Sequence, residues 1–402
     1  MAPRAPINPA IAATMEPPVM MARRWLDGVE FPPERPLINV SQAAPVAPPP
    51  APLRNAIAET ARQDDSAHLY GPVLGMAELR AEVAAQWSAA YEGEITPANV
   101  AITAGCNQAF AAALATLAGP GDEVILPSPW YFNHRMWLDM QRVHTVPLAT
   151  GDDLLPCPER AARLITSRTR AIVLVTPNNP GGTEYPTGLL RAFLDLARRR
   201  GLALVIDETY RDFHSAPGAP HDLFADPDWP DTLIQLYSFS KAYRLTGHRV
   251  GAMIAAPARL AEAEKFLDTV GICPGQLGQR AALWGMRNLG SWLAGERAEI
   301  LARRAAIAAG LARLPGWRLM GAGAYFAYVH HPFAENAQAL APDLVRRAGI
   351  LMLPGTMFRP AGDPAGAEEF RIAFANIDTE GIDTLLARLA ALPLPPGTQP
   401  PK

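Results

Sequence analysis

The sequence predicts an α/β fold in which a mostly parallel central sheet is covered by helices, with a smaller α/β domain beside it. The chain has 402 residues, 49% of them hydrophobic, which is enough to build one large core and a second, smaller one. From Met76 to about Pro180, short apolar or β-branched segments alternate with segments of helical periodicity, the pattern of βαβ units. After about Met286 the composition changes to long stretches rich in Ala, Arg and Glu.

The N-terminal region is expected to contain little regular structure. Prolines cluster in the first eighteen residues and again in residues 45–52, and both segments are predicted to be extended, solvent-exposed arms. Between them, Val19–Leu26 is predicted to form a short helix whose apolar side carries Met20, Met21 and Trp25.

The central region supplies the helices and strands of the large domain. Leu79, Val83 and Trp87 recur at helical spacing and predict a helix over Met76–Tyr91. Further helices are expected over the alanine-rich Asn107–Ala118 and over Thr187–Arg200. The predicted strands are Val100–Thr103, Glu123–Leu126, Val143–Pro147, Ala171–Thr176, Ala203–Asp207 and Thr232–Tyr237.

The C-terminal region predicts the smaller α/β unit. Its expected elements are a helix over Ser291–Leu314, a strand over Ala324–Val329, a helix near Ala339–Ala348, a turn at Leu353–Gly355, a strand over Phe370–Phe374 and a final helix. The tail after Leu392 is expected to be frayed. We therefore expect residues 1–65 to form an N-terminal arm and part of the small domain, residues 66–285 the large domain and residues 286–402 the small C-terminal domain.

Composition narrows the possible functions. A formal charge of -3 and a pI of about 6.3 give no sign of a nucleic-acid or anionic-membrane surface. Three cysteines are too few, and odd in number, for a disulfide framework, which favours a reducing compartment and a cytoplasmic protein. The longest apolar stretch, Ala109–Gly119, is far shorter than the ~18 residues of a membrane span. Prolines interrupt the N-terminus, so a secretory signal is not expected.

Polar residues gather where the predicted strands end. In a parallel, covered sheet the carboxyl ends of the strands are where ligands bind. Here those ends carry Thr103–Gly105, Ser128–Tyr131, Asn178–Pro180, Asp207 and Ser238–Lys241. The sequence therefore predicts a site along this edge.

Lys241 is the lysine in this chain that follows a predicted buried strand. Of the other two, Lys265 lies in a charged helical stretch and Lys402 is the last residue. A desolvated lysine can lose its proton and form a Schiff base with an aldehyde. Taken alone, Lys241 fits an ordinary loop lysine better than a catalytic one, and the residues around it reverse this interpretation.

The surrounding residues match the needs of pyridoxal 5'-phosphate, which requires a carboxylate, a phenolic-oxygen donor, a stacking aromatic and a phosphate cup. Asp207, at a buried strand end, could supply the carboxylate that the cofactor needs, or it could cap the helix that follows. Asn179 fits the donor or a simple turn residue. Tyr131 could stack on the cofactor ring, or it could simply pack in the core. Gly105–Asn107 open a helix whose free N–H groups favour a phosphate.

Five segments carry a family resemblance over nearly the whole chain. They are Tyr70–Arg80, Asn178–Gly182 with its Asn-Pro turn, Val205–Tyr210 with its Asp-x-x-Tyr strand end, Ser238–Gly251 around Lys241, and Phe370–Phe374 with its arginine. In this order and at this spacing they resemble the class I/II aminotransferases of pyridoxal-phosphate fold type I.

The resemblance implies roles for individual residues in holding the cofactor ring. Lys241 would bind the cofactor as a Schiff base and then move the catalytic proton. Asp207, backed by His134, would keep the pyridine nitrogen protonated. Around the ring, the stacking residue would be Tyr131, and the groups reaching the phenolic oxygen would be Asn179 and Tyr210.

The resemblance also implies the phosphate and substrate contacts. The phosphate would be held by Cys106, Asn107, Ser238, Arg249 and, from the partner subunit of a homodimer, the catalytic-site residue Tyr70. Arg371 would bind the substrate α-carboxylate through two parallel hydrogen bonds, with Asn179 and the loop at Ala43 beside it. No metal site is expected.

Two features depart from the family pattern. The N-terminal substrate loop usually has a glycine where Ser41–Pro45 has Ala43, and the extra methyl could narrow the pocket. No second arginine for a substrate side-chain carboxylate is apparent, which favours a neutral or aromatic substrate. The candidate residues to line a pocket for such a side chain are Trp25, Phe31, His68 and Trp130. Each of them could equally well be a residue that only packs in the structure.

The resemblance implies a ping-pong aminotransferase acting on an α-amino acid and a 2-oxo acid. A C–S β-lyase or another Cα chemistry on the same fold would use the same residues. A non-catalytic, regulator-like protein that binds the cofactor would need a basic helix-turn-helix extension, for which the N-terminus is too short. A nicotinamide dehydrogenase is disfavoured because no G-x-G-x-x-G follows the first strand.

Overall fold

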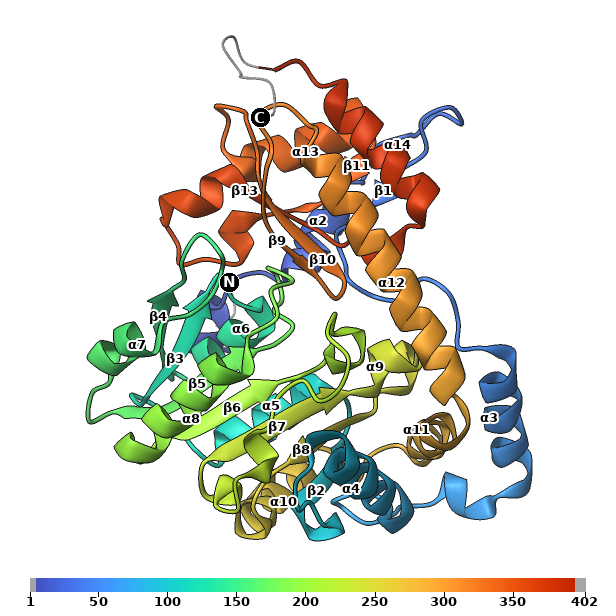
Figure 1. The fold of residues 1–402 in the computed structure, drawn as a ribbon, viewed down its shortest axis with the longest axis vertical. Helices are drawn as coiled ribbons and strands as arrows, with labels where there is room; N and C mark the ends of the chain where they lie inside the picture. Colours follow the sequence, from blue (N-terminus) through green and yellow to red (C-terminus); the bar gives the residue numbers. More distant parts are fainter. Residues whose placement is uncertain (1–4, 395–402) are drawn as a thin grey trace.

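The computed structural model describes residues 5–394 and contains two layered units (Figure 1). A large seven-stranded sheet, sandwiched between helices, occupies the lower part of Figure 1. A smaller four-stranded sheet with its own helices lies above it, and the long helix α12 (Gly290–Leu311) runs from one unit to the other. The predicted α/β fold is confirmed.

The large sheet has the strand order β2-β8-β7-β6-β5-β3-β4. Its strands are β2 (Val100–Thr103), β3 (Glu123–Ser128), β4 (His144–Ala149), β5 (Thr169–Val175), β6 (Ala203–Asp207), β7 (Leu233–Ser238) and β8 (Gly251–Ile254). Strand β8 pairs antiparallel with both β2 and β7, whereas the other pairs are parallel. The sheet is therefore mostly parallel, as predicted, and β2 still runs in the same direction as β7.

Helices cover both faces of the large sheet, which explains why its strands are apolar throughout. Leu204 and Ile206 pack in the core on one face, under α4 (Ala77–Tyr91), α7 (Pro158–Leu164), α8 (Thr187–Arg200) and α11 (Gln276–Asn288). Ala203 and Val205 pack in the core on the other face, under α5 (Cys106–Ala115), α6 (Phe132–Met140) and α10 (Pro257–Gly271). Consecutive strand residues point to opposite faces, so a strand buried on both sides has no polar alternation.

The smaller unit is an antiparallel sheet of order β12-β13-β10-β9. Its elements are β9 (Arg318–Gly323), β10 (Phe326–His330), β12 (Leu353–Pro354), β13 (Glu369–Ile372), α13 (Ala337–Ala348) and α14 (Thr379–Ala390). The N-terminal segment joins it through β1 (Ile38–Asn39), which pairs in parallel with β11 (Ile350–Leu351). A segment from the N-terminal part of the chain thus joins the C-terminal elements in one unit.

The N-terminal region is more helical than predicted. Residues 9–13 form α1 (Pro9–Ala13), which Asn8 caps by accepting a hydrogen bond from the Ala10 N–H at 3.0 Å. Helix α2 (Pro18–Arg24) is close to the predicted helix, but α3 (Ala51–Gln63) was not expected. Proline at the first turn of a helix costs little, because the N–H that it lacks has no partner there. Reading these prolines as markers of extended chain was therefore wrong where they open α1 and α3.

Several other boundaries also differ from the predictions. Helices α6 and α11 and strands β8 and β9 were not expected, whereas α10 forms where the sequence around Lys265 indicated a helix. Leu353–Pro354 form a strand rather than a turn. Ala324, predicted as the start of a strand, has a positive φ of 45° and lies in the turn before β10. Much of the tail expected to be frayed, residues 395–402, lies outside the described residues.

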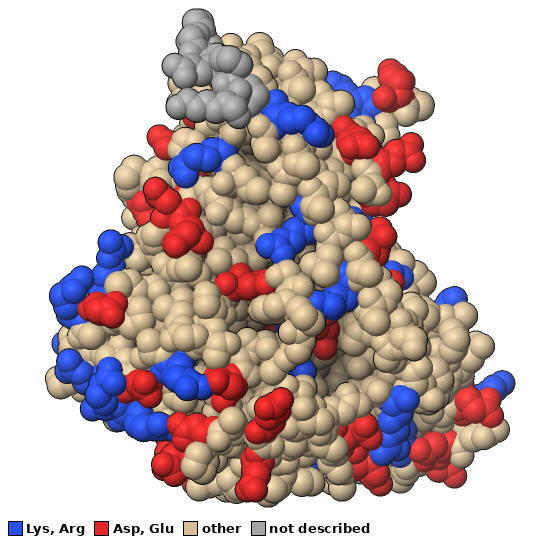
Figure 2. All heavy atoms as spheres, in the orientation of Figure 1, with Lys and Arg blue, Asp and Glu red and all other residues tan. Residues whose placement is uncertain are grey.

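The surface carries mixed charge. Positive and negative side chains are interspersed on the face seen in Figure 2, consistent with the small formal charge of -3. Within residues 5–394, no helix is both long enough and apolar enough to cross a bilayer.

Candidate active site

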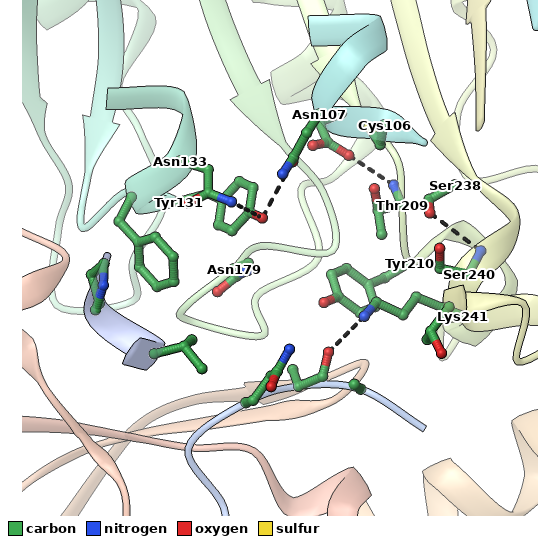
Figure 3. Close-up of a pocket in the computed structure, with 18 of the residues that line it drawn as sticks. Cys106, Asn107, Tyr131, Asn133, Asn179, Thr209, Tyr210, Ser238, Ser240 and Lys241 are labelled. Carbon is green, nitrogen blue, oxygen red and sulfur yellow. Dashed lines mark hydrogen bonds between the residues drawn. The ribbon is translucent and has the colours of Figure 1, made fainter. Parts of the chain in front are cut away.

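A cavity of about 440 Å³ opens at the carboxyl ends of the large sheet's parallel strands (Figure 3). Eleven of the thirteen predicted site residues line it: Ala43, Cys106, Asn107, Tyr131, Asn179, Asp207, Tyr210, Ser238, Lys241, Arg249 and Arg371. His134 lies behind Asp207, and Tyr70 lies elsewhere on the surface. The structure therefore brings most of the predicted site residues together at the strand ends, as the strand-end argument expected.

Lys241 projects into this cavity from α9 (Phe239–Ala242), directly after β7. Its Nζ donates a hydrogen bond to the Ala43 carbonyl at 2.6 Å. Desolvation, with added repulsion from Arg249 and Arg371, lowers the pKa of Lys241 to about 8. Much of the amine is therefore uncharged at mildly alkaline pH, as a nucleophile or base requires.

In the cofactor-free protein, Lys241 is expected to react with an amine-modifying reagent at a rate that rises with pH and is half-maximal near pH 8. The neutral amine is the reactive form, so the rate climbs through the pKa and levels off above it. Reductive methylation followed by mass spectrometry of the digest measures this profile. Lys265, exposed beside Glu262, is the internal reference, and coincident pH profiles for the two lysines would contradict the expectation.

Asp207 ends β6 as a buried carboxylate, 3% exposed, held from two sides. The Thr209 N–H donates to its Oδ1 at 2.9 Å, and His134 Nε2 lies 3.3 Å from its Oδ2. The His134 ring stacks on Phe110 with 3.9 Å between ring centroids. Burial raises the pKa of Asp207, but His134 and Thr209 outweigh burial and hold that pKa below its ordinary value. Asp207 is thus a stable anion within the cavity wall.

A group of N–H and cationic donors forms the end of the cavity nearest α5. Helix α5 begins at Cys106 and Asn107, so its free backbone N–H groups face this end. The Arg249 Nη1 donates to Ser240 Oγ at 3.4 Å and to the Thr246 carbonyl at 3.2 Å. This cationic corner, with Ser238 in its wall, is suited to a phosphate. Burial raises the pKa of the Cys106 thiol well above its usual value, so Cys106 contributes its backbone and not a thiolate.

Gly105→Ala is expected to weaken binding of pyridoxal phosphate about tenfold or more. Gly105 has φ +88° and ψ 167°, a region that costs other residues ~1–3 kcal/mol. An added methyl would also meet the Arg249 guanidinium. Titration of the cofactor-free protein measures the affinity. Gly247→Ala is the control, because Gly247 lies in the neighbouring loop with open space around it. Equal affinities for the two variants would contradict the assignment of this end of the cavity to the phosphate.

Two tyrosines, Tyr131 and Tyr210, line the cavity. The Tyr131 hydroxyl donates to Asn107 Oδ1 at 3.3 Å and accepts a hydrogen bond from Asn133 Nδ2 at 2.9 Å, which fixes its ring (Figure 3). Burial, with the Asp207 charge, raises the pKa of Tyr131 to about 12. Tyr210 packs against Tyr325 and its pKa is also raised by burial, so both phenols stay protonated.

Arg371 is the most informative residue of the site. Its side chain lies on β13, is 2% exposed and packs over Phe326 and Phe358, with its carbon Cζ 5.1 and 4.8 Å from their ring centroids. The Nη1 donates to Asn179 Oδ1 at 3.0 Å and Nη2 donates to the Ser41 carbonyl.

No carboxylate pairs with Arg371 among the described residues, and its Nε has no hydrogen-bond partner. Burial lowers the pKa of Arg371 to about 10. A buried cation without a counter-ion is costly, so the arrangement calls for an anionic ligand.

Ala43 contributes its backbone to the site. Its carbonyl accepts the Lys241 hydrogen bond, an interaction that an alanine makes as well as a glycine does. The four residues proposed to line a neutral or aromatic pocket are placed elsewhere. Trp25 and Phe31 pack in the apolar cluster under α2, His68 contacts the Ala61 carbonyl, and Trp130 lines a separate small cavity.

Sequence reasoning missed several lining residues. Thr209, Ser240 and Thr246 fall inside the segments that carried the family resemblance, so the signal was present but unused. Asn133 neighbours the predicted His134, and a polar residue in the first turn of α6 could have been weighed. The face of α2 that lines the cavity, including Arg23, carried no local signal, because its position depends on distant packing.

Comparisons with known proteins agree with this geometry. Residues 36–389 match the family model described as aminotransferase class I and II. A probable aspartate/prephenate aminotransferase of Thermus aquaticus is 30% identical over 73% of this chain and 77% of its own length. Aromatic aminotransferase ISS1 of Arabidopsis thaliana is 28% identical over 80% of each chain. The structure of aspartate aminotransferase from Thermus thermophilus with maleate superposes with a TM-score of 0.87 at 24% identity, covering 96% of this chain and 99% of that one.

A buried strand-end lysine and carboxylate beside a phosphate cup define an enzyme of the pyridoxal-phosphate class with fold type I. The chain belongs to the class I and II aminotransferase family, and it is a pyridoxal-phosphate-dependent aminotransferase.

The residues present fit this cofactor. The Gly105 cradle leaves room beside Arg249 that a side chain would fill, which suits a phosphate. Asp207 offers a stable anion for a protonated pyridine nitrogen, and Lys241 offers an amine that loses its proton readily. Arg371, a buried cation without a counter-ion, remains for the substrate.

Proposed function

We propose that the chain transfers an amino group between an α-amino acid and a 2-oxo acid in this cavity, with Lys241 as the residue that binds the cofactor and moves the proton. Pyridoxal phosphate, when bound, supplies an electron-poor ring that stabilises negative charge at the substrate Cα. The observation that carries the proposal is Arg371, since both substrates of a ping-pong transaminase share an α-carboxylate and a buried guanidinium binds it in each.

The chain's residues divide the work on the reacting centre. Lys241, whose pKa is about 8, takes the proton from Cα and delivers it to the adjoining cofactor carbon. Asp207 keeps the pyridine nitrogen protonated, and His134 stabilises Asp207 from behind. Tyr131, which lines the cavity, would stack on the cofactor ring. Before substrate binds, Asn179 Oδ1 accepts a hydrogen bond from Arg371. The Asn179 amide N–H groups would donate to the phenolic oxygen of the cofactor, which Tyr210 would also approach.

Residues at the two ends of the cavity would hold the two charged groups, the cofactor phosphate and the substrate α-carboxylate. Cys106 and Asn107 donate backbone N–H groups to the phosphate, with Ser238 and Arg249 as side-chain donors. Arg371 binds the α-carboxylate through two parallel hydrogen bonds, in exchange for its contacts with neutral oxygens.

A panel of amino acids offered with 2-oxoglutarate tests the reaction itself. Transamination predicts one molecule of new 2-oxo acid for each glutamate formed, and the cofactor spectrum should cycle between its two forms. Steady release of pyruvate and a thiol without an acceptor would assign the chain to C–S β-lyase chemistry instead.

We also propose a homodimer in which Tyr70 reaches the partner's phosphate site. Tyr70 is 80% exposed, and the neighbouring Leu69, Val270 and Ile272 are also exposed. The hydrogen bond from the Gly71 N–H to Cys273 Sγ, 3.4 Å, brings these two segments together into one apolar surface. Such a surface supports an interface between copies of the chain.

Mixing Tyr70→Ala chains with Lys241→Ala chains is expected to restore activity. In a mixed dimer one site has both residues intact, so random exchange of subunits should recover about a quarter of wild-type activity. Sedimentation should give a dimer. A fully active monomer at assay concentration, or a mixture no more active than its components, would overturn the shared site.

Two coarser assignments complete the proposal. Residues 66–285 form the large cofactor-binding domain, with residues 1–65 and 286–402 supplying the arm and the small domain; the separate apolar cores support this division. The cytoplasm is the proposed compartment, supported by three cysteines that are all unpaired.

A further inference from the structure

Arg23 places a positive charge at the mouth of the active-site cavity. Helix α2 lays one face over the cavity, and the lining residues from this segment are Pro17, Pro18, Val19, Met20 and Arg23. Arg23 follows Val19 by four residues and Met20 by three, so these three side chains share one side of the helix. The face is apolar where it starts and cationic where it ends.

Arg23 is tied to the loop that contacts both Lys241 and Arg371. Its Nη2 donates to Gln42 Oε1 at 2.9 Å. On either side of Gln42, the Ser41 carbonyl accepts from Arg371 and the Ala43 carbonyl accepts from Lys241. A substrate held between Arg371 and Lys241 therefore lies against the same short loop that Arg23 contacts.

The charges around the cavity leave Arg23 without an assigned anion. Among the described lining residues the cations are Arg23, Lys241, Arg249 and Arg371, and the one carboxylate is Asp207. The proposed function assigns Arg249 to a phosphate and Arg371 to the α-carboxylate. Within residues 5–394 Arg23 has no carboxylate within 4 Å, whereas its neighbour Arg24 pairs with Glu16 at 2.9 Å.

We propose that Arg23 is a specificity-determining residue that binds the side-chain carboxylate of a dicarboxylic amino acid and of the matching 2-oxo acid. The inference rests on the proposed function, because Arg371 must hold the first carboxylate. Val19 and Met20 then contact the methylene groups between the two carboxylates. Arg23 exchanges its bond to the neutral Gln42 amide for a charge-assisted one.

This placement also predicts that discrimination is moderate. Arg23 is exposed and keeps its Gln42 partner when a neutral substrate binds, so no buried charge is stranded. A solvated ion pair gains little compared with a buried one. We therefore expect a preference for dicarboxylates of about tenfold, with neutral amino acids accepted as slower substrates.

Binding of two unreactive acids of equal length to the holoenzyme separates this role from a structural one. Calorimetry with glutarate, a dicarboxylate, and pentanoate, its monocarboxylate counterpart, should show Arg23→Gln weakening glutarate about tenfold while pentanoate changes less than twofold. Arg24→Gln, one residue along the same helix, should leave both affinities unchanged. Arg23→Glu should reverse the preference, and added salt should reduce it in the wild type.

The outcomes distinguish this inference from the proposed function. If Arg23→Gln leaves glutarate binding unchanged, or weakens both acids equally, Arg23 does not select the side chain. If either result is found while Arg371→Lys weakens both acids, the role of Arg371 in binding the shared α-carboxylate is retained and only the role of Arg23 is excluded. Wild-type holoenzyme that binds neither acid would contradict carboxylate binding by Arg371, and with it the proposed function.

Discussion

Lys241→Ala is expected to abolish transamination while leaving the cofactor bound through its phosphate. Lys241 supplies both the attachment point and the base, and loss of a positioned base alone costs up to about 10⁴-fold. The α5 N-terminus, Ser238 and Arg249 do not depend on the lysine, so the phosphate contacts remain. Activity in both half-reactions and the stoichiometry of retained cofactor measure the two effects separately.

Lys265→Ala is the matched control for this variant, because Lys265 is a surface residue whose ion pair with Glu262 is solvent-exposed. It should retain wild-type activity. A Lys241→Ala protein within tenfold of wild type would show that another group performs the proton transfer.

Arg371→Lys is expected to lower kcat/KM in both half-reactions by about 30-fold to 1,000-fold, since a badly formed buried charge-assisted pair costs ~2–4 kcal/mol. Lysine keeps the charge but cannot make two parallel hydrogen bonds to a carboxylate. A lysine at this buried position, between Phe326 and Phe358, would also lose its proton more readily than the arginine does.

Single-turnover measurements with an amino acid and with a 2-oxo acid give the two rates for this variant. Arg318→Lys, an exposed arginine on β9 of the same small sheet, should leave both rates unchanged. A loss confined to one half-reaction would mean that Arg371 is not the clamp shared by the two substrates.

The sequence was sufficient to predict that most of the proposed site residues meet at one edge of the sheet, because this information is local. Asp207 and Lys241 each follow an apolar strand, and in a covered parallel sheet such strand ends meet along one edge. Arg371 was singled out for a related reason: an arginine in a buried strand needs a polar or anionic partner. Glu369, two residues earlier in β13, pairs with Arg359 instead.

What the sequence did not reveal depends on distant packing. Strand β8 has only four residues and begins with a glycine, and its place between β2 and β7 is set by pairing across the sheet. Helix α3 was obscured by the prolines that open it. The position of α2 over the cavity follows from apolar contacts with the small unit, so Arg23 could not be assigned to the active site from its own segment.

Reduction of the purified holoenzyme with borohydride, followed by peptide mapping, tests the central claim most directly. Reduction makes the cofactor–lysine linkage permanent, and the chain offers only Lys241, Lys265 and Lys402 as attachment points. The account predicts a yellow protein that loses its colour on reduction, with the cofactor mass on the peptide containing Lys241 in one copy per chain. Cofactor mass on the peptide containing Lys265, or a colourless protein that gains no mass, would contradict it.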